Sequence, residues 1–527
     1  MSYLQLLRLV SPEAIVVLTA LVVLAIGLMQ SRRTVVTPVS AAEPRASAGG
    51  TSAATPACAM VAGLGLVLAI VVIFILPRNA TVFAGMLVIS PLNALFKIIC
   101  LVLALVTVAL TEGEKALRNR GEYLAIVLLA TVGLMLLVGS EELLMIFIGL
   151  ELLGLSLYVL TAFDKIDIFS AEAGLKYFLF GSTASAFTLF GISLVYGMSG
   201  STLLALIAQK LAIEPMQPLL AGGIVMTLIG FAFKIAAAPF HLWAPDAYQG
   251  APVTSAAFIA SGSKVASFVV LGKIVLIGFA PLRGSADWHA LVAGWSPVLA
   301  VLAAVSILLG NFVALAQTNV RRLLAYSAVA HGGYTLLGII AGSREGFAAT
   351  LFYTTIYAVT LVGAFAVVGI VRRETGGDNL ANFVGLRARS PLAAACMSIF
   401  MLSLAGIPPL AGFFGKFYLF SVALRAGENH GLLWLVAVAL FGSFVSLYYY
   451  LMVIKAMFVE EPATRHELLV TRLPRRSAAE AGHAPVAPER SGGGSLVTGI
   501  VAALAAIVLL FGIDPSGLIT HILNSLE

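Results

Sequence analysis

Charged residues are scarce in this sequence, and cysteines are scarcer. Only 11% of the 527 residues are charged, whereas 60% are hydrophobic and the mean hydropathy is +1.03. Soluble domains carry about 25% charged residues, so this composition excludes an assembly of soluble domains. The three cysteines (Cys58, Cys100 and Cys396) have no CxxC spacing and indicate no zinc, haem or iron–sulfur site. The net charge of +6 includes no basic run interleaved with aromatic residues, so no nucleic-acid partner is predicted.

Long apolar stretches make up much of the sequence. A helix that crosses a bilayer needs about 20 mostly apolar residues. Fourteen stretches meet this condition: 14–30, 59–77, 88–110, 121–139, 143–163, 173–198, 218–238, 253–277, 295–316, 323–342, 347–371, 391–422, 432–456 and 495–513. The sequence therefore predicts an all-α polytopic membrane protein with about 14 transmembrane helices.

The basic residues outside these stretches are distributed unevenly. Eighteen Lys and Arg residues lie in the odd-numbered gaps between spans, and six lie in the even-numbered gaps and the two tails. Basic loops face the cytoplasm, so both termini are expected on the opposite, periplasmic side. Two odd gaps, 31–58 and 458–494, are polar linkers rich in small residues, Pro or mixed charge.

Two predicted spans are broken by proline, and each carries a lysine near its break. Helix 7 has Lys234 before Pro239, and helix 12 has Pro408-Pro409 before Lys416. The two helices are five spans apart, which inverts their orientation, as expected for inverted five-helix repeats made of helices 4–8 and 9–13. The predicted divisions are 1–120, 121–280 (first repeat), 290–457 (second repeat), 458–494 and 495–527.

Several ionisable residues lie inside apolar spans, where a charge costs at least about 2.5 kcal/mol. Glu151 is flanked by Leu and Gly, and its alternative role is a pair that serves helix packing alone. Lys234 has snorkelling toward a membrane surface as its alternative. Lys264 lies too deep in its span to reach either surface. Lys416 follows a break whose freed carbonyls can hold a cation or water.

Two further candidates have weaker support. Lys176 forms an i, i+4 pair with Glu172 that could simply stabilise the start of a helix. His331 lies in mid-span, where either packing or proton relay suits an imidazole. Three other lysines lie near span ends and are expected to snorkel: Lys97, Lys273 and Lys455. Because no nucleophile–base pair, phosphate loop or metal-ligand cluster accompanies this set, the sequence indicates proton handling.

Four segments carry a resemblance to a known family. They are 150–158 (LELLGLSLY), 230–252, 261–264 (SGSK) and 322–331. On these segments the sequence resembles the antiporter-like subunits of respiratory complex I, which are similar to subunits of Mrp-type cation/proton antiporters. Segments 172–181 (EAGLKYFLFG) and 403–416 (SLAGIPPLAGFFGK) favour subunit N of the proton-pumping NADH–quinone oxidoreductase within that family.

The resemblance implies a role for each candidate residue. It implies that Glu151 and Lys234 form a modulating ion pair, that Lys264 is the central proton relay, and that Lys416 is the exit-side site. Lys176 and His331 then belong to the polar axis that connects these groups. The linkers 31–58 and 458–494 are longer than the family pattern suggests.

The resemblance also implies a setting for the chain. It implies a multi-pass subunit of the bacterial inner membrane that contacts lipid and other complex I subunits, including antiporter-like and small ones. It implies no cofactor in this chain, with NADH, FMN, iron–sulfur clusters and quinone bound by partner subunits. Two alternatives remain open: a subunit of an Mrp-like cation/proton antiporter, and a structural membrane subunit that does not pump.

Overall fold

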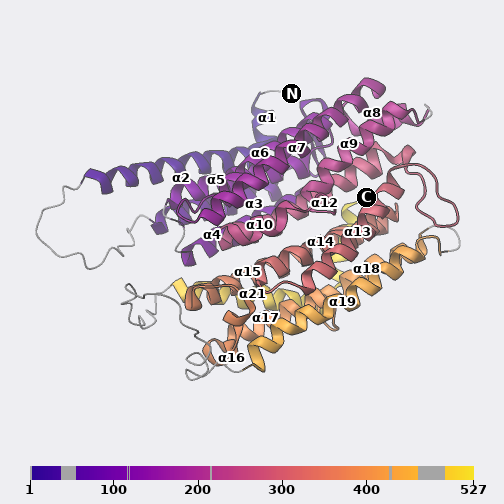
Figure 1. The fold of residues 1–527 in the computed structure, drawn as a ribbon. Helices are drawn as coiled ribbons and strands as arrows, with labels where there is room; N and C mark the ends of the chain where they lie inside the picture. The colour runs from indigo at the N-terminus through magenta and orange to yellow at the C-terminus, as the bar shows by residue number, and fades with distance from the viewer. Residues whose placement is uncertain are drawn as a thin grey trace, which may run out of the picture.

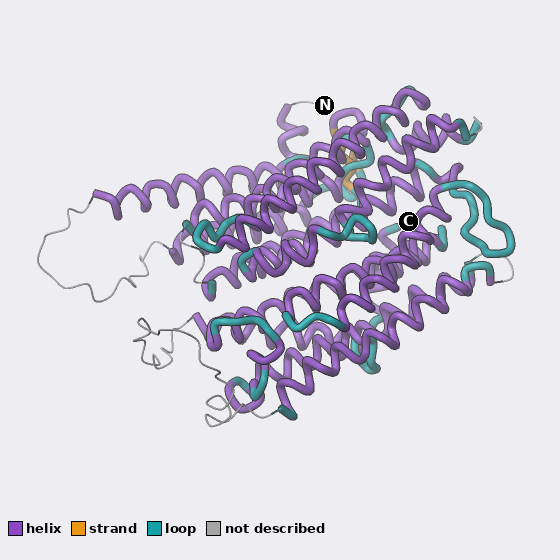
Figure 2. The backbone as a smooth tube through the Cα atoms, viewed as in Figure 1, coloured by secondary structure: helices purple, strands orange, loops and turns teal. Residues whose placement is uncertain are grey.

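The structure, a computed structural model, describes residues 3–36, 55–114, 117, 119–213, 216–426, 430–460 and 493–526. In these residues the chain is a helical bundle with one short hairpin, in which β1 (Ala80–Val82) pairs antiparallel with β2 (Leu87–Ile89). Figures 1 and 2 show long helices that lie side by side with their axes roughly aligned, and little other secondary structure. The predicted all-α membrane fold is confirmed.

In the part of the chain that the structure describes, twelve helical segments are long and apolar enough to cross a membrane. They are α2 (Ser11–Val36), α3 (Thr55–Ile75), α4 (Pro91–Leu110), α5 (Arg120–Gly139), α6 (Leu143–Thr161), α7 (Ile168–Ser199), the segment Val253–Gly278, α13 (Trp295–Leu315), α14 (Val320–Ile340), α15 (Arg344–Thr375), α19 (Leu433–Phe458) and α21 (Gly493–Ile513). Two apolar helices are shorter, α9 (Pro218–Lys234) and α17 (Pro391–Ala405). The count of 14 crossings therefore stays a prediction.

The same order of elements occurs twice along the chain. Helices α5, α6 and α7 precede α9, which ends at a break before α10 (Trp243–Gly250) and is followed by Val253–Gly278. Helices α13, α14 and α15 precede α17, which ends at a break before α18 (Ala411–Arg425) and is followed by α19. The third helix of each series, α7 or α15, has 32 residues. This order agrees with two five-helix repeats, whose exact boundaries remain an interpretation.

The segment Val253–Gly278 is itself composite. It contains α11 (Val253–Ala260), α12 (Gly262–Lys273) and a π-helical turn, η3 (Ile274–Gly278). The remaining short elements are α1 (Tyr3–Leu9), α8 (Leu204–Leu211), α16 (Leu386–Arg389), α22 (Ser516–Ser525), and the 3-10 turns Phe83–Gly85, Thr111–Gly113, Ala280–Leu282 and Leu380–Phe383.

Local chemistry fixes several helix ends. The Ser90 side chain accepts a hydrogen bond from the amide of Asn93, and Pro91 is the first residue of α4, a favourable position for proline. Asn319 caps α14 by accepting from the amides of Arg321 and Arg322. Gly406 ends α17 with a φ of +86°, a left-handed conformation in which a side chain would be strained.

The predicted linkers differ in how well they match the helix bounds. Helix α2 continues to Val36 and α3 begins at Thr55, so the predicted linker 31–58 is too long at both ends. Each helix extends beyond its apolar stretch, because the backbone hydrogen bonds of a helix continue into neighbouring polar residues. Helices α19 and α21 end and begin close to the predicted limits of 458–494. Residues 37–54 and 461–492 lie outside the described residues.

The most buried helices lie at the centre of the bundle. Val253–Gly278 and α14 are each 94% buried within their apolar windows, and α15 is 89% buried, whereas α2 is only 28% buried. Helix α15 lies against α11, α14, α17 and α18. Polar groups on these central helices therefore depend on partners inside the protein.

Candidate functional site

The break between α9 and α10 holds the ammonium group of Lys264. Lys264 on α12 is 2% exposed, and its Nζ donates a hydrogen bond to the carbonyl of Ile235, which directly follows α9. Other groups at this break are satisfied from outside the helix: Trp243 Nε1 donates to the Phe233 carbonyl at 3.0 Å, and the Ala238 amide donates to Ser306 Oγ at 2.8 Å. The break therefore exchanges helical hydrogen bonds for contacts that include a buried cation.

The predicted Glu151–Lys234 ion pair is not formed in this structure. Glu151 on α6 accepts a hydrogen bond from Ser185 on α7, and Lys234 Nζ has no hydrogen-bond partner among the described residues. The two side chains nevertheless line one small cavity between α6, α7 and α9. Lys234 is 6% exposed, and its Nζ lies 5.9 Å from the centre of the Tyr158 ring. Snorkelling of Lys234 is thus wrong.

The second break holds Lys416 in a similar way. Its Nζ donates to the carbonyl of Ala405, the last residue of α17, at 3.0 Å, and to Ser443 Oγ on α19 at 2.9 Å. The ammonium also lies 5.2 Å from the centre of the Tyr334 ring. Both breaks thus place a main-chain carbonyl against a buried lysine, as the sequence predicted for Lys416.

His331 on α14 lies between two tyrosines. Its Nδ1 is 2.5 Å from the hydroxyl of Tyr353 on α15, and its Nε2 is 2.9 Å from the hydroxyl of Tyr450 on α19. The Tyr450 hydroxyl is also hydrogen-bonded to Ser327. The histidine is 2% exposed and its two ring nitrogens are both engaged, which suits either a packing role or a relay.

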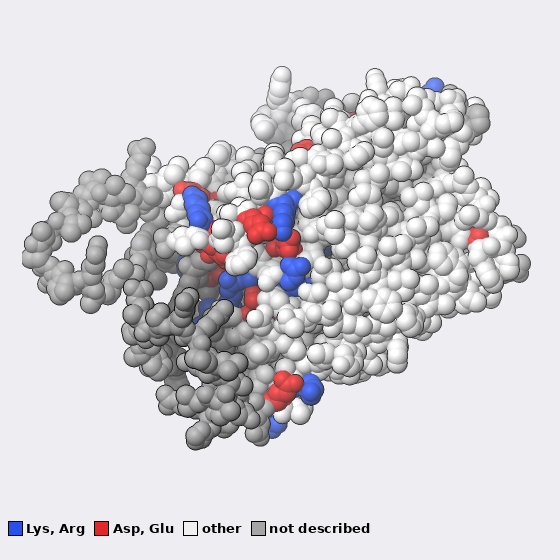
Figure 3. Space-filling model, viewed as in Figure 1, with Lys and Arg blue, Asp and Glu red and all other residues white. Residues whose placement is uncertain are grey.

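Lys176 lies on the outside of the chain. Its Nζ is 2.7 Å from Glu172 Oε1, as the spacing predicts, and 2.8 Å from Asp246 Oδ2 on α10. Asp246 also pairs with Arg322 Nη1 at 2.6 Å. The Lys176 side chain is 41% exposed. Figure 3 shows charged side chains gathered in one band of this face around α10, while most of the face is uncharged.

The three lysines that are expected to snorkel have different environments in the structure. Lys455 does so, since its side chain is 62% exposed and pairs with Glu460 at 3.3 Å. For Lys97 and Lys273 the prediction is wrong, because both are buried and bonded. Lys97 pairs with Glu13 at 2.5 Å, and Lys273 donates to Asn93 Oδ1 at 2.6 Å. Partners on distant helices made burial possible.

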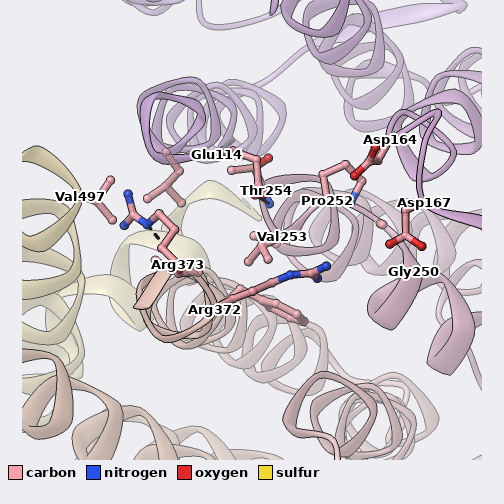
Figure 4. Close-up of a pocket in the computed structure, with 16 residues that line it drawn as sticks. Glu114, Asp164, Asp167, Gly250, Pro252, Val253, Thr254, Arg372, Arg373 and Val497 are labelled. Carbon is pink, nitrogen blue, oxygen red and sulfur yellow. Dashed lines mark hydrogen bonds between the residues drawn. The ribbon is translucent and has the colours of Figure 1, made fainter. Parts of the chain in front are cut away.

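A charged pocket of about 220 Å³ opens where α11 begins and α15 ends. In Figure 4, Arg372 and Arg373 come from α15 on one side, and Asp164 and Asp167 lie on the other. The Glu114 carboxylate accepts a hydrogen bond from the Thr254 amide at 3.4 Å at this pocket. Polar groups therefore line an opening at the start of Val253–Gly278, the segment that carries Lys264.

Sequence reasoning missed one buried ion pair beside this pocket. Arg321 on α14 is 3% exposed and pairs with Asp378, while its Nη1 donates to the Ala251 carbonyl at 2.8 Å. Arg321 was counted only as a basic loop residue. The position of Asp378 just after the end of α15 was the available signal.

Comparison with known proteins places the chain in a family. The family model described as NADH:quinone oxidoreductase/Mrp antiporter, TM matches residues 140–446. NADH-quinone oxidoreductase subunit N 2 of Acidobacterium capsulatum is 46% identical over 472 residues, which cover 87% of this chain and 91% of the relative. NADH-quinone oxidoreductase subunit N of Desulforamulus reducens is 39% identical, with coverage of 86% and 88%.

Solved structures give the same result for the fold. A chain of respiratory complex I from Thermus thermophilus is 30% identical with a TM-score of 0.73, covering 97% of this chain and 98% of that one. A chain of the Mrp complex from Dietzia sp. is 21% identical with a TM-score of 0.77, covers 99% and 97%, and shows the fold alone. The chain therefore belongs to the NADH:quinone oxidoreductase/Mrp antiporter transmembrane family, and its relatives of known sequence include subunit N of NADH-quinone oxidoreductase.

Proposed function

We propose that this chain is the antiporter-like subunit N of a proton-pumping NADH–quinone oxidoreductase and that it moves protons through buried side chains. One observation carries the proposal: two lysines deep in the membrane fold, Lys264 and Lys416, are each held by a carbonyl that a helix break has freed. A packing role needs no such pairing of break and cation, because an apolar side chain would fill the same space at lower cost.

The proton path runs along the row Glu151, Lys234, Lys264, His331 and Lys416. Glu151 and Lys234 line one cavity without forming an ion pair, so a small movement of α6 relative to α9 suffices to close the pair. Closing it favours the charged form of Lys234, and opening it favours release of its proton toward Lys264. Lys416 then delivers the proton at the exit side. Lys176 joins this row from the surface, where its pair with Asp246 gives a neighbouring subunit a charged contact.

The energy for transport comes from other subunits. Moving one proton against 100 mV costs about 2.3 kcal/mol. We propose that partner subunits bind NADH, FMN, iron–sulfur clusters and quinone, and that this chain contributes no cofactor site. The expected setting is the bacterial inner membrane, with both termini on the periplasmic side.

The substitution Lys264→Ala in the assembled complex tests the proposal. We expect the complex to assemble and proton-coupled NADH oxidation to fall, while Lys455→Ala, which removes an exposed lysine, leaves it unchanged. Unchanged pumping in Lys264→Ala would overturn the relay. A lower yield of assembled complex, with unchanged pumping by each complex that does assemble, would favour a structural subunit. Proton transport that requires sodium and no redox partner would favour an Mrp-like antiporter.

A further inference from the structure

A second group of charges, three of them buried, lies apart from the row of relay residues. It consists of Glu13 on α2, Lys97 on α4, Lys273 at the end of α12, and Glu141 between α5 and α6. Lys97 pairs with Glu13 at 2.5 Å, and Lys273 lies 3.4 Å from a Glu141 oxygen. Glu13, Lys97 and Lys273 are each less than 10% exposed, a costly arrangement for groups that only pack.

The two lysines meet at the end of α5. Lys273 Nζ donates to the carbonyl of Val138 at 2.8 Å, and Lys97 Nζ lies so close to the next residue that a Cβ on Gly139 would be 3.0 Å from it. Asn93, one turn before Lys97 on α4, accepts from Lys273 at 2.6 Å. The four charged groups therefore form one cluster across four elements.

An unpartnered polar side chain lies on the same short segment as Glu141. The hydroxyl of Ser140, between Gly139 and Glu141 in the chain, is fully buried and has no hydrogen-bond partner within the described ranges. A buried hydroxyl without a hydrogen-bond partner destabilises the fold. This unsatisfied hydroxyl is next in the chain to Glu141, in the short segment that supplies one carboxylate of the cluster.

The cluster has an outlet. Asn93 and Lys97 line a cavity of about 600 Å³ whose other polar lining includes Arg78, His521 and Asn524. Arg78, His521 and Asn524 are exposed. This cavity lies at the end of the bundle where α4 begins, opposite the charged pocket at Leu110 and Glu114 near the end of α4.

We propose that Glu13, Lys97, Lys273 and Glu141 form a proton-exchange site that connects the interior of the chain with the membrane face at which α4 begins. This inference rests on the proposed proton transport. Two ammonium groups beside two carboxylates make the cluster neutral, so a proton passes from an ammonium to a carboxylate without leaving an isolated charge. From Lys97 the proton reaches water in the cavity, and a proton from the interior restores the charge. Glu142, which caps α6, and Asn93 hold the surrounding backbone.

The substitution Lys97→Arg separates exchange from packing. Arginine keeps the positive charge and the pair with Glu13, but it does not release a proton in proteins. We expect the complex to assemble with normal thermal stability and its proton-coupled turnover in proteoliposomes to fall about tenfold, or about 1.4 kcal/mol on the rate-limiting barrier. Lys273→Arg is expected to behave in the same way.

Lys455→Arg is the matched control, because it makes the same chemical change at an exposed lysine outside the cluster. If Lys97→Arg and Lys273→Arg pump at the wild-type rate, the cluster serves packing and the inference is overturned. If Lys97→Arg does not assemble, Glu13→Gln decides: lost pumping in an assembled complex supports exchange, and retained pumping overturns it. If Lys264→Ala loses pumping and the cluster variants keep it, the proposed function stands and only the proposed exchange site is overturned.

Discussion

The ammonium group of Lys264 donates a hydrogen bond to the carbonyl of Ile235, the residue that follows the end of α9. Helix α9 carries Lys234 as its last residue, so one break lies beside two buried lysines. Any movement of the backbone at this break changes the surroundings of both. A positive charge on one lysine also makes protonation of the other less favourable.

The space around Lys234 is set by a glycine on α6. A Cβ on Gly154 would lie 3.1 Å from Lys234 Nζ and 3.1 Å from the Tyr158 hydroxyl. We expect Gly154→Ala to displace the ammonium and to slow proton-coupled turnover about tenfold. Gly222→Ala on α9, which meets nothing within 4 Å, is the control and is expected to pump normally. Equal rates for both variants would show that the position of Lys234 is not critical.

The tyrosine beside His331 is expected to contribute to stability. Tyr450→Phe removes a hydroxyl that bonds both His331 and Ser327, so His331 Nε2 and the Ser327 hydroxyl each lose this partner in a buried site. The loss should lower the free energy of unfolding in detergent by about 1–3 kcal/mol. Tyr448→Phe, at a side chain that is 62% exposed, should change it by much less. A stability loss in Tyr448→Phe alone would contradict this assignment.

The buried pair of Arg321 and Asp378 makes a stronger prediction. Asp378→Asn leaves the guanidinium of Arg321 buried without its counter-charge and should destabilise the chain by about 3–5 kcal/mol. Glu460→Gln breaks an exposed pair with Lys455 and should cost at most about 1 kcal/mol. Chemical denaturation of the purified full chain in detergent measures both values. Similar costs for the two variants would show that burial of the first pair is incomplete.

The proposed orientation is testable with single cysteines. The native cysteines Cys58, Cys100 and Cys396 are buried, so an impermeant thiol reagent should not reach them. Cysteines at the exposed positions Glu460 and Asn524 should react from opposite sides, with Asn524 on the periplasmic side. Labelling from the same side would refute the proposed orientation.

The apolar stretches and the prolines were sufficient to predict the helices and the two breaks. A bilayer-length apolar run has few alternatives to a helix, since its backbone must satisfy its own hydrogen bonds. Similar reasoning identified Lys264, which lies too deep in its span to reach either surface, and Lys416, which follows a helix break. These are local properties of the chain.

Only the tertiary structure decided which charged groups meet. Lys97 finds Glu13 across 84 residues, and Lys176 adds Asp246 to the partner that its own helix supplies. Lys234 remains without a hydrogen-bond partner although Glu151 is near. Sequence spacing predicts pairs within one helix, where geometry is fixed by the turn. Pairs between helices depend on how side chains of different helices pack, and that packing is set by the whole bundle.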